Sequence, residues 1–295
     1  MPLFDDDFLS RLEYLSLVSR RAFQGQMMAQ RRSRQLGTGI EFADHRQYTA
    51  GDDFRYLDWN LYARHGELLL KRFQEEQDLH VYLLLDCSRS MLSGDGRKFD
   101  LARQLTAALA YIALADLDRV AVCAFADGVL HEFPLTRGKA RIVSLLEFLE
   151  RLQADGDGTS LNQLVSQFAA RSPRPGLAVV LSDLFAPDGY TEAIDRLRFQ
   201  KFEPHLVQIH GPDEADPQLL GDVELIDAET GEVRQMTITE QQIRSYRNAF
   251  ANFLKSLSAY CLDNGLGCSI TDSSRPYDEL VLQMLRFSGG ALSGA

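Results

Sequence analysis

The sequence predicts an α/β fold with a mostly parallel central sheet and helices on both of its faces. Two apolar runs, residues 81–85 and 176–181, carry no charged side chain, which is typical of strands buried on both faces in a parallel sheet. From residue 79 onward, such runs alternate with amphipathic stretches that predict helices. Because helices between parallel strands need right-handed crossovers, we expect them to cover both faces of one sheet.

The other elements follow from hydrophobic periodicity and from turn residues. Phe8, Leu12 and Leu15 recur at helical spacing in a predicted N-terminal helix. Helices are expected at residues 5–34, 98–117, 139–152, 161–170, 190–201, 239–264 and 277–287. Further strands are expected at residues 119–125, 129–133, 205–209 and 267–271, and the strand at 129–133 is the expected hairpin partner at the sheet edge.

Acidic residues concentrate in an insertion that precedes the helix expected from residue 239. Residues 211–240 hold nine acids and one arginine, and residues 223–238 predict an exposed β-hairpin. Because apolar residues alternate with acids in this hairpin, we expect one face on the domain and the other in water. Thr239 and Gln242 form a capping box that begins the following helix.

The composition indicates a globular protein whose main partner is not nucleic acid. Of its 295 residues, 45% are hydrophobic and 25% are charged, and the net charge is −11. This acidic balance argues against nucleic-acid binding, although five arginines without an acid lie in residues 14–40, either as a solvated face or as an interaction surface. There is no apolar stretch of bilayer length, the N-terminal residues are acidic where a signal peptide is basic, and the four cysteines form no C-x-x-C pair. We therefore expect a cytoplasmic protein with reduced thiols.

A carboxylate and two hydroxyls follow the buried run at residues 81–85. Asp86, Ser88 and Ser90 occupy alternate positions, and such a strand delivers its first loop residues to the carboxyl edge of the sheet, where open α/β folds bind ligands. Oxygen donors alone suit a hard divalent cation, Mg²⁺ before Mn²⁺ or Ca²⁺, and not zinc or copper. A simpler interpretation is that these residues only cap the next helix.

Thr159 and Asp183 extend this pattern into two later loops. Together with D-x-S-x-S at residues 86–90, they resemble the metal-ion-dependent adhesion site of von Willebrand factor A domains. The resemblance implies that the hydroxyls of Ser88, Ser90 and Thr159 bind the ion, while the two carboxylates act largely through bound water. It further implies a von Willebrand A-like (Rossmann-like) sheet and a protein partner that donates an Asp or Glu to the metal.

The segment before the first buried run is dense in Asp, Arg and aromatic residues. It resembles the signature E-F-x-D-x-R-x-Y-x-x-G-D-D-x-R-x-I-D-W-x-x-x-A-R of the bacterial domain of unknown function 58 family, with Leu57 in place of Ile. The matching residues are Glu41, Phe42, Asp44, Arg46, Tyr48, Gly51, Asp52, Asp53, Arg55, Asp58, Trp59, Ala63 and Arg64. We expect this segment to be an ion-paired surface element that packs on the main domain and covers Trp59. The alternative is a polar strand-and-turn lead-in without a role of its own.

These resemblances imply a protein-interaction module rather than an enzyme. The family is often encoded beside a MoxR-type AAA+ ATPase, which suggests an adaptor or substrate selector for such a partner. The alternative is a Mg²⁺-dependent, phosphatase-like hydrolase that uses Asp86, although Ser88 stands where aspartyl phosphatases usually have a second Asp. The expected parts are an N-terminal helical segment at 1–36, the signature segment at 37–78, and the von Willebrand A-like domain at 79–290 with the hairpin insertion at 211–238.

Overall fold

The computed structural model describes residues 3–18, 36–37, 41–49, 52–74, 79–156, 158–171 and 174–287. The chain divides into two compact units. We call residues 1–19 with 79–295 the sheet unit, and residues 20–78 the signature unit. No helix in the described ranges is long and apolar enough to cross a membrane.

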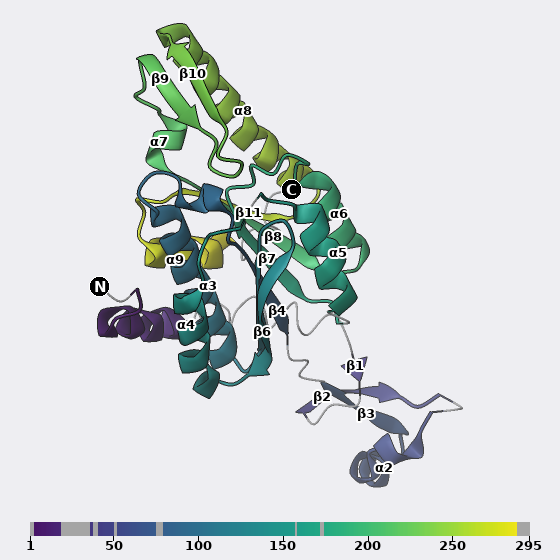
Figure 1. Cartoon of the computed structure of the whole chain (residues 1–295). Helices are drawn as coiled ribbons and strands as arrows, with labels where there is room; N and C mark the ends of the chain where they lie inside the picture. The colour runs from purple at the N-terminus through teal and green to yellow at the C-terminus, as the bar shows by residue number, and fades with distance from the viewer. Residues whose placement is uncertain are drawn as a thin grey trace. The chain divides into compact units, whose positions relative to one another are not determined.

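The sheet unit is built on a six-stranded sheet in the order β11-β8-β7-β4-β5-β6 (Figure 1). Its strands are β4 (His80–Asp86), β5 (Arg119–Phe125), β6 (Val129–Arg137), β7 (Leu177–Ser182), β8 (Glu203–His210) and β11 (Gly267–Asp272). Neighbouring strands pair in parallel except β5 and β6, which pair antiparallel at one edge. The predicted mostly parallel sheet and its antiparallel edge hairpin are therefore confirmed.

Helices cover both faces of this sheet, as the side chains of β4 show. Val81, Leu83 and Leu85 join one buried apolar cluster, whereas Tyr82 and Leu84 join another on the opposite face. The first cluster includes side chains of α3 (Arg97–Ala115), α4 (Ile142–Arg151) and α9 (Tyr277–Phe287). The second includes side chains of α5 (Leu161–Arg171), α6 (Thr191–Phe199) and α8 (Glu240–Asp263). Because every residue of β4 is buried, the loop after it begins in the interior of the unit.

The N-terminal helix belongs to the sheet unit. It spans residues 6–18, and Asp5 caps it by accepting a hydrogen bond from Phe8 N at 2.8 Å. Phe8, Leu12 and Leu15 are buried in the first cluster, and the ring of Phe8 lies 4.8 Å from that of Tyr277 in α9. The expected continuation of this helix over residues 19–34 lies outside the described residues.

An insertion separates β8 from α8. It contains the short helix α7 (Pro212–Ala215) and the antiparallel hairpin of β9 (Gly221–Ile226) and β10 (Val233–Ile238). The predicted capping box is present, with Gln242 N donating to Thr239 Oγ1 at 3.3 Å. The expectation that one apolar face packs on the domain is wrong for most of the hairpin. Val223 and Ile238 are half-buried, but four apolar residues are exposed: Leu225, Ile226, Val233 and Met236.

The signature unit has its own small antiparallel sheet, in the order β1-β3-β2. Its elements are β1 (Leu36–Gly37), β2 (Glu41–Gln47), a 3₁₀ turn (Phe54–Tyr56), α2 (Trp59–His65) and β3 (Leu69–Gln74). Asp58 caps α2 by accepting from Asn60 N at 3.0 Å and Leu61 N at 3.2 Å. Leu57 and Leu70 are buried, which gives this unit an apolar contact of its own.

Candidate functional site

Three loops of the sheet unit meet at the carboxyl edge of its sheet. Asp86 ends β4 and Asp183 follows β7, and these two strands are neighbours in the sheet. The loop that carries Thr159 joins them through Gly156, whose N–H donates to Cys87 O at 3.2 Å and whose carbonyl accepts from Arg89 N at 3.2 Å. A Cβ atom at Gly156 would lie 2.2 Å from the Ala126 Cβ atom, so this close approach requires glycine.

Asp86 is fully buried and its orientation is fixed by two hydrogen bonds. Its Oδ1 accepts from Ser88 N at 2.9 Å, and its Oδ2 accepts from Ser182 Oγ at 2.5 Å. Ser88 Oγ and Ser90 Oγ lie 2.9 Å apart, at the start of a 3₁₀ turn. Burial, followed by the nearby charge of Asp183, raises the pKa of Asp86 to about 7. The pattern D-x-S-x-S therefore forms a compact cluster of oxygen atoms.

Asp183 has a buried lysine as its partner. Lys98, at the start of α3, is 1% exposed, and its Nζ lies 3.2 Å from Asp183 Oδ2 and 2.5 Å from Glu214 Oε1 in α7. The sequence interpretation did not include Lys98. The position of Lys98 in the sequence could have indicated its burial. A lysine four residues before Ala102 and seven before Leu105 lies on the apolar face of the helix.

Thr159 is buried at this edge, and its hydroxyl donates to Glu229 Oε1 at 3.0 Å. Glu229 lies in the turn between β9 and β10. The sequence placed this glutamate in an exposed hairpin and gave no sign of the contact, since 70 residues separate the two.

The five predicted residues thus come from three loops that the fold brings to one edge. They supply two carboxylates and three hydroxyls: Asp86, Ser88, Ser90, Thr159 and Asp183. No group of three His, Cys, Asp or Glu side chains suited to a metal ion occurs in the described ranges. A donor set of this composition, rich in hydroxyl oxygens and free of nitrogen and sulfur, fits a hard cation such as Mg²⁺.

The signature residues are brought together within their own unit, mainly as ion pairs. Arg46 binds Asp52 through two bonds of 2.9 and 2.6 Å, and Arg55 pairs with Asp53 at 2.6 Å. The hydrogen bond from Arg46 lowers the pKa of Asp52 to about 2. The expected ion-paired surface element is confirmed for these pairs.

Asp58, another signature residue, caps α2 and also contacts His45. Asp58 Oδ2 lies 3.0 Å from His45 Nε2, and this bond lowers the pKa of Asp58 to about 2. Tyr48 stacks on Phe54 with ring centroids 5.2 Å apart. Within the signature unit Trp59 is 60% exposed, and its coverage by the main domain stays a prediction. Arg64 is also exposed. Gly51 and the side chains of Glu41 and Asp44 lie outside the described residues.

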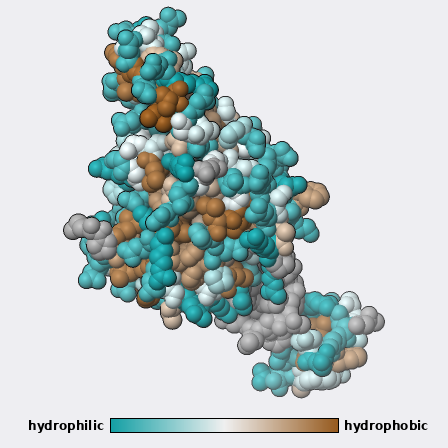
Figure 2. Space-filling view, viewed as in Figure 1, coloured by the Kyte–Doolittle hydropathy of each residue, from teal (hydrophilic) through white to brown (hydrophobic). Residues whose placement is uncertain are grey.

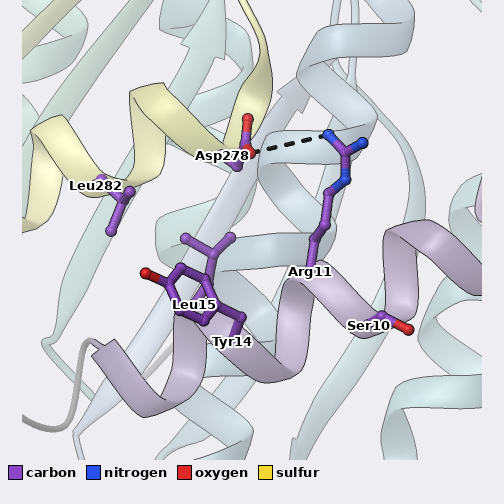
Figure 3. A pocket seen from close by; sticks show the side chains of 6 residues that line it. All are labelled: Ser10, Arg11, Tyr14, Leu15, Asp278 and Leu282. Atoms are coloured by element: carbon purple, nitrogen blue, oxygen red, sulfur yellow. Dashed lines mark ion pairs between the residues drawn. The ribbon is translucent and has the colours of Figure 1, made fainter.

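A cavity of about 220 Å³ lies elsewhere in the sheet unit (Figure 3). Tyr14 and Leu15 of the N-terminal helix face Leu282 of α9 across it, and Arg11 lies 3.9 Å from Asp278 at its rim. The five predicted residues are not part of its lining, so the candidate site is separate from this cavity.

Comparison with known proteins identifies the family. Residues 44–255 match the family described as "Protein of unknown function DUF58", and the chain belongs to this family. It is 25% identical over 238 residues to "Uncharacterized protein Rv1480" of Mycobacterium tuberculosis and to "Uncharacterized protein Mb1516" of Mycobacterium bovis, covering 79% of this chain and 75% of each relative.

Solved structures similar to this chain include a von Willebrand type A protein. The conserved hypothetical protein BatB from Bacteroides thetaiotaomicron is 17% identical with a TM-score of 0.43, over 71% of this chain and 98% of that chain. A von Willebrand factor type A protein from Catenulispora acidiphila is 16% identical with a TM-score of 0.41, over 76% of this chain and 44% of that chain.

Proposed function

We propose that this protein is a metal-dependent protein-interaction module. The observation that carries the proposal is the meeting of Asp86, Ser88 and Ser90 with the loops of Thr159 and Asp183 at one sheet edge. Open α/β sheets bind their ligands at this edge. The same edge carries five oxygen-bearing side chains, a donor set suited to holding a small cation. Lys98 already offsets the charge of one of the two carboxylates, Asp183.

The hydroxyls and the carboxylates have different roles in the proposed site. The hydroxyls of Ser88, Ser90 and Thr159 would hold the cation, with Mg²⁺ as the first candidate and Mn²⁺ or Ca²⁺ as others. The buried carboxylates supply negative charge around it. When bound, such an ion supplies an electrophilic centre for a carboxylate from outside. Because these three hydroxyls are neutral, they hold the ion only modestly by themselves, and an Asp or Glu of a partner protein strengthens the site.

The partner class follows from the sequence resemblance. A MoxR-type AAA+ ATPase in the cytoplasm is the first candidate, with this chain as its adaptor or substrate selector. Under linkage, partner and metal strengthen each other's binding by the same factor. A metal chelator should therefore release the partner.

The hydrolase alternative has weaker support from the geometry. An aspartyl nucleophile needs a carboxylate oxygen open to the substrate. Asp86 is fully buried, and each of its oxygens already accepts a hydrogen bond. We expect no Asp86-dependent phosphatase activity from the purified protein with Mg²⁺.

The proposal is tested with Asp86→Ala and, as a matched control, Asp95→Ala. Asp95 is an exposed carboxylate that pairs with Arg97 at 2.8 Å. Calorimetric titration with Mg²⁺ should show binding to the wild type and the control but not to Asp86→Ala. Capture of the partner should follow the same order and be lost with chelator. Equal Mg²⁺ binding by all three proteins would exclude the site.

A further inference from the structure

The acidic hairpin contacts the candidate cation site through its turn. Thr159 Oγ1 donates to Glu229 Oε1 at 3.0 Å, and a Cβ atom at Gly158 would lie 3.9 Å from Glu229 Oε2. Both carboxylate oxygens therefore lie near the loop that carries Thr159. Glu229 is half-buried, whereas the residues around it in the turn, 227–228 and 230–232, are exposed.

The turn holds Glu229 in this position by hydrogen bonds of its own. Asp227 Oδ1 accepts from Glu229 N at 3.0 Å and from Thr230 N at 2.7 Å. The backbone closes the turn, since Asp227 N donates to Glu232 O at 2.9 Å, and Gly231 has a φ of 70° that suits glycine. The carboxylate is thus presented by a preorganised turn.

The insertion also reaches the site at its other end. Glu214 in α7 pairs with Lys98 at 2.5 Å, and Gly211 N donates to Glu214 Oε2 at 2.7 Å. In contrast, most apolar side chains of the hairpin strands are exposed, including Ile226 at 67%, and Figure 2 shows apolar side chains on this part of the surface. The turn is therefore held at the site by a polar contact, which a competing carboxylate can replace.

We infer that Glu229 is the chain's own carboxylate ligand for the cation and takes the coordination position that a partner's acid would use. This inference rests on the proposed function. A hydroxyl that binds a cation through an oxygen lone pair still has a proton to donate, and Glu229 is the acceptor of the Thr159 proton.

An internal carboxylate changes which partners the site accepts. Because Glu229 is tethered, its effective concentration at the site is high, and a free acid must displace it. A lone Asp or Glu side chain is then a weak competitor. The partner class is therefore an acidic protein surface that also contacts this protein away from the metal. In this way the hairpin limits which partner proteins can bind.

The test uses the full chain and Mn²⁺ as the probe. Glu229→Gln removes the charge but keeps an oxygen that can accept from Thr159. The matched control is Glu224→Gln, an exposed acid of β9 opposite Gln235. Calorimetry should show Mn²⁺ affinity about tenfold weaker for Glu229→Gln and unchanged within about twofold for the control.

Water-proton relaxation of the bound Mn²⁺ provides a second measurement. Loss of the internal carboxylate opens a position to water, so relaxation enhancement per bound ion should rise in Glu229→Gln alone. Sodium acetate should reverse that rise, because a free carboxylate then enters the opened position.

The possible outcomes distinguish this inference from the proposed function on which it rests. Equal Mn²⁺ affinity and relaxation in wild type and Glu229→Gln, with binding abolished by Asp86→Asn, would overturn the role of Glu229 and leave the metal site intact. Absence of Mn²⁺ binding by the wild type would overturn the proposed function, and the role of Glu229 with it.

Discussion

The two compact units of this protein use carboxylates in opposite ways. In the sheet unit, Asp86 and Asp183 are buried near each other, and burial raises the pKa of Asp86 to about 7. In the signature unit, Asp52 binds Arg46 at the surface, and its pKa falls to about 2. An acid already paired with arginine is satisfied within the chain. Asp86 and Asp183 are buried close together, and the repulsion between them favours a positive charge beyond that of Lys98, which pairs with Asp183.

Sequence distance explains part of this difference. Arg46 and Asp52 are six residues apart, so one turn brings them together. Lys98 and Asp183 are 85 residues apart and meet only when the sheet has formed. The ion pairs of the signature unit therefore form within local structure. The groups at the sheet edge come together only in the folded unit, so a function that uses them requires that fold.

The largest expected effect comes from removing the buried cation. Lys98→Met should lower the free energy of unfolding by about 3–5 kcal/mol, because it leaves buried Asp183 without its partner. The control is Lys139→Met, whose Nζ lies 3.5 Å from Glu13 at the surface, and its loss should be below about 1 kcal/mol. Urea unfolding followed by far-ultraviolet circular dichroism, with chelator present, measures both. Equal losses would contradict the contrast between buried and exposed pairs.

The sequence was sufficient for the sheet and for the positions of Asp86 and Asp183 at its carboxyl edge. Buried strands such as β4 and β7 are continuous apolar runs, and Asp86 and Asp183 follow directly from where these runs end. The contacts of Lys98 and Glu229 were not predictable in this way, because each joins elements whose spacing in the sequence says nothing about their approach.

In the signature unit, too, the sequence predicted only part of the structure. Its dense charges indicated an ion-paired surface, which Arg46 and Asp52 confirm. Its aromatic content suggested that the main domain covers Trp59. Within the signature unit this residue is exposed, and its coverage by the main domain stays a prediction. Aromatic size favours burial, but Leu57 and Leu70 provide the apolar contact of this small sheet instead.

A smaller effect is expected when a hydroxyl that donates a hydrogen bond to an Asp carboxylate is removed from either unit. Ser182→Ala should cost about 1.5–3 kcal/mol, because buried Asp86 loses the hydroxyl that donates to its Oδ2. Thr49→Ala removes a hydroxyl that donates to Asp52 at 2.8 Å, but both groups are at or near the surface, so its effect should stay within about 0.5 kcal/mol.

Unfolding of the two units can be followed separately in this comparison. Circular dichroism follows Ser182→Ala in the sheet unit. Fluorescence follows Thr49→Ala in the signature unit, because Trp59 is the only tryptophan. A cost for Thr49→Ala as large as that for Ser182→Ala would show that burial is not what distinguishes the two sites.

The smallest expected effect is a change in one surface pKa. Arg46→Gln should raise the pKa of Asp52 from about 2 toward its ordinary value of 3.8, because the hydrogen bond from Arg46 is the main cause of the lowering. With a lowered folded-state pKa, the pair stabilises the signature unit above the ordinary pKa, and this stability is lost as the pH falls toward 2. Nuclear magnetic resonance titration of the Asp52 carboxyl carbon measures the shift. In the control, Arg55→Gln should raise the pKa of Asp53 and leave Asp52 unchanged, since Arg55 is the partner of Asp53. If either variant moved both carboxylates equally, the signature pairs would form one shared network and not two independent, locally satisfied pairs.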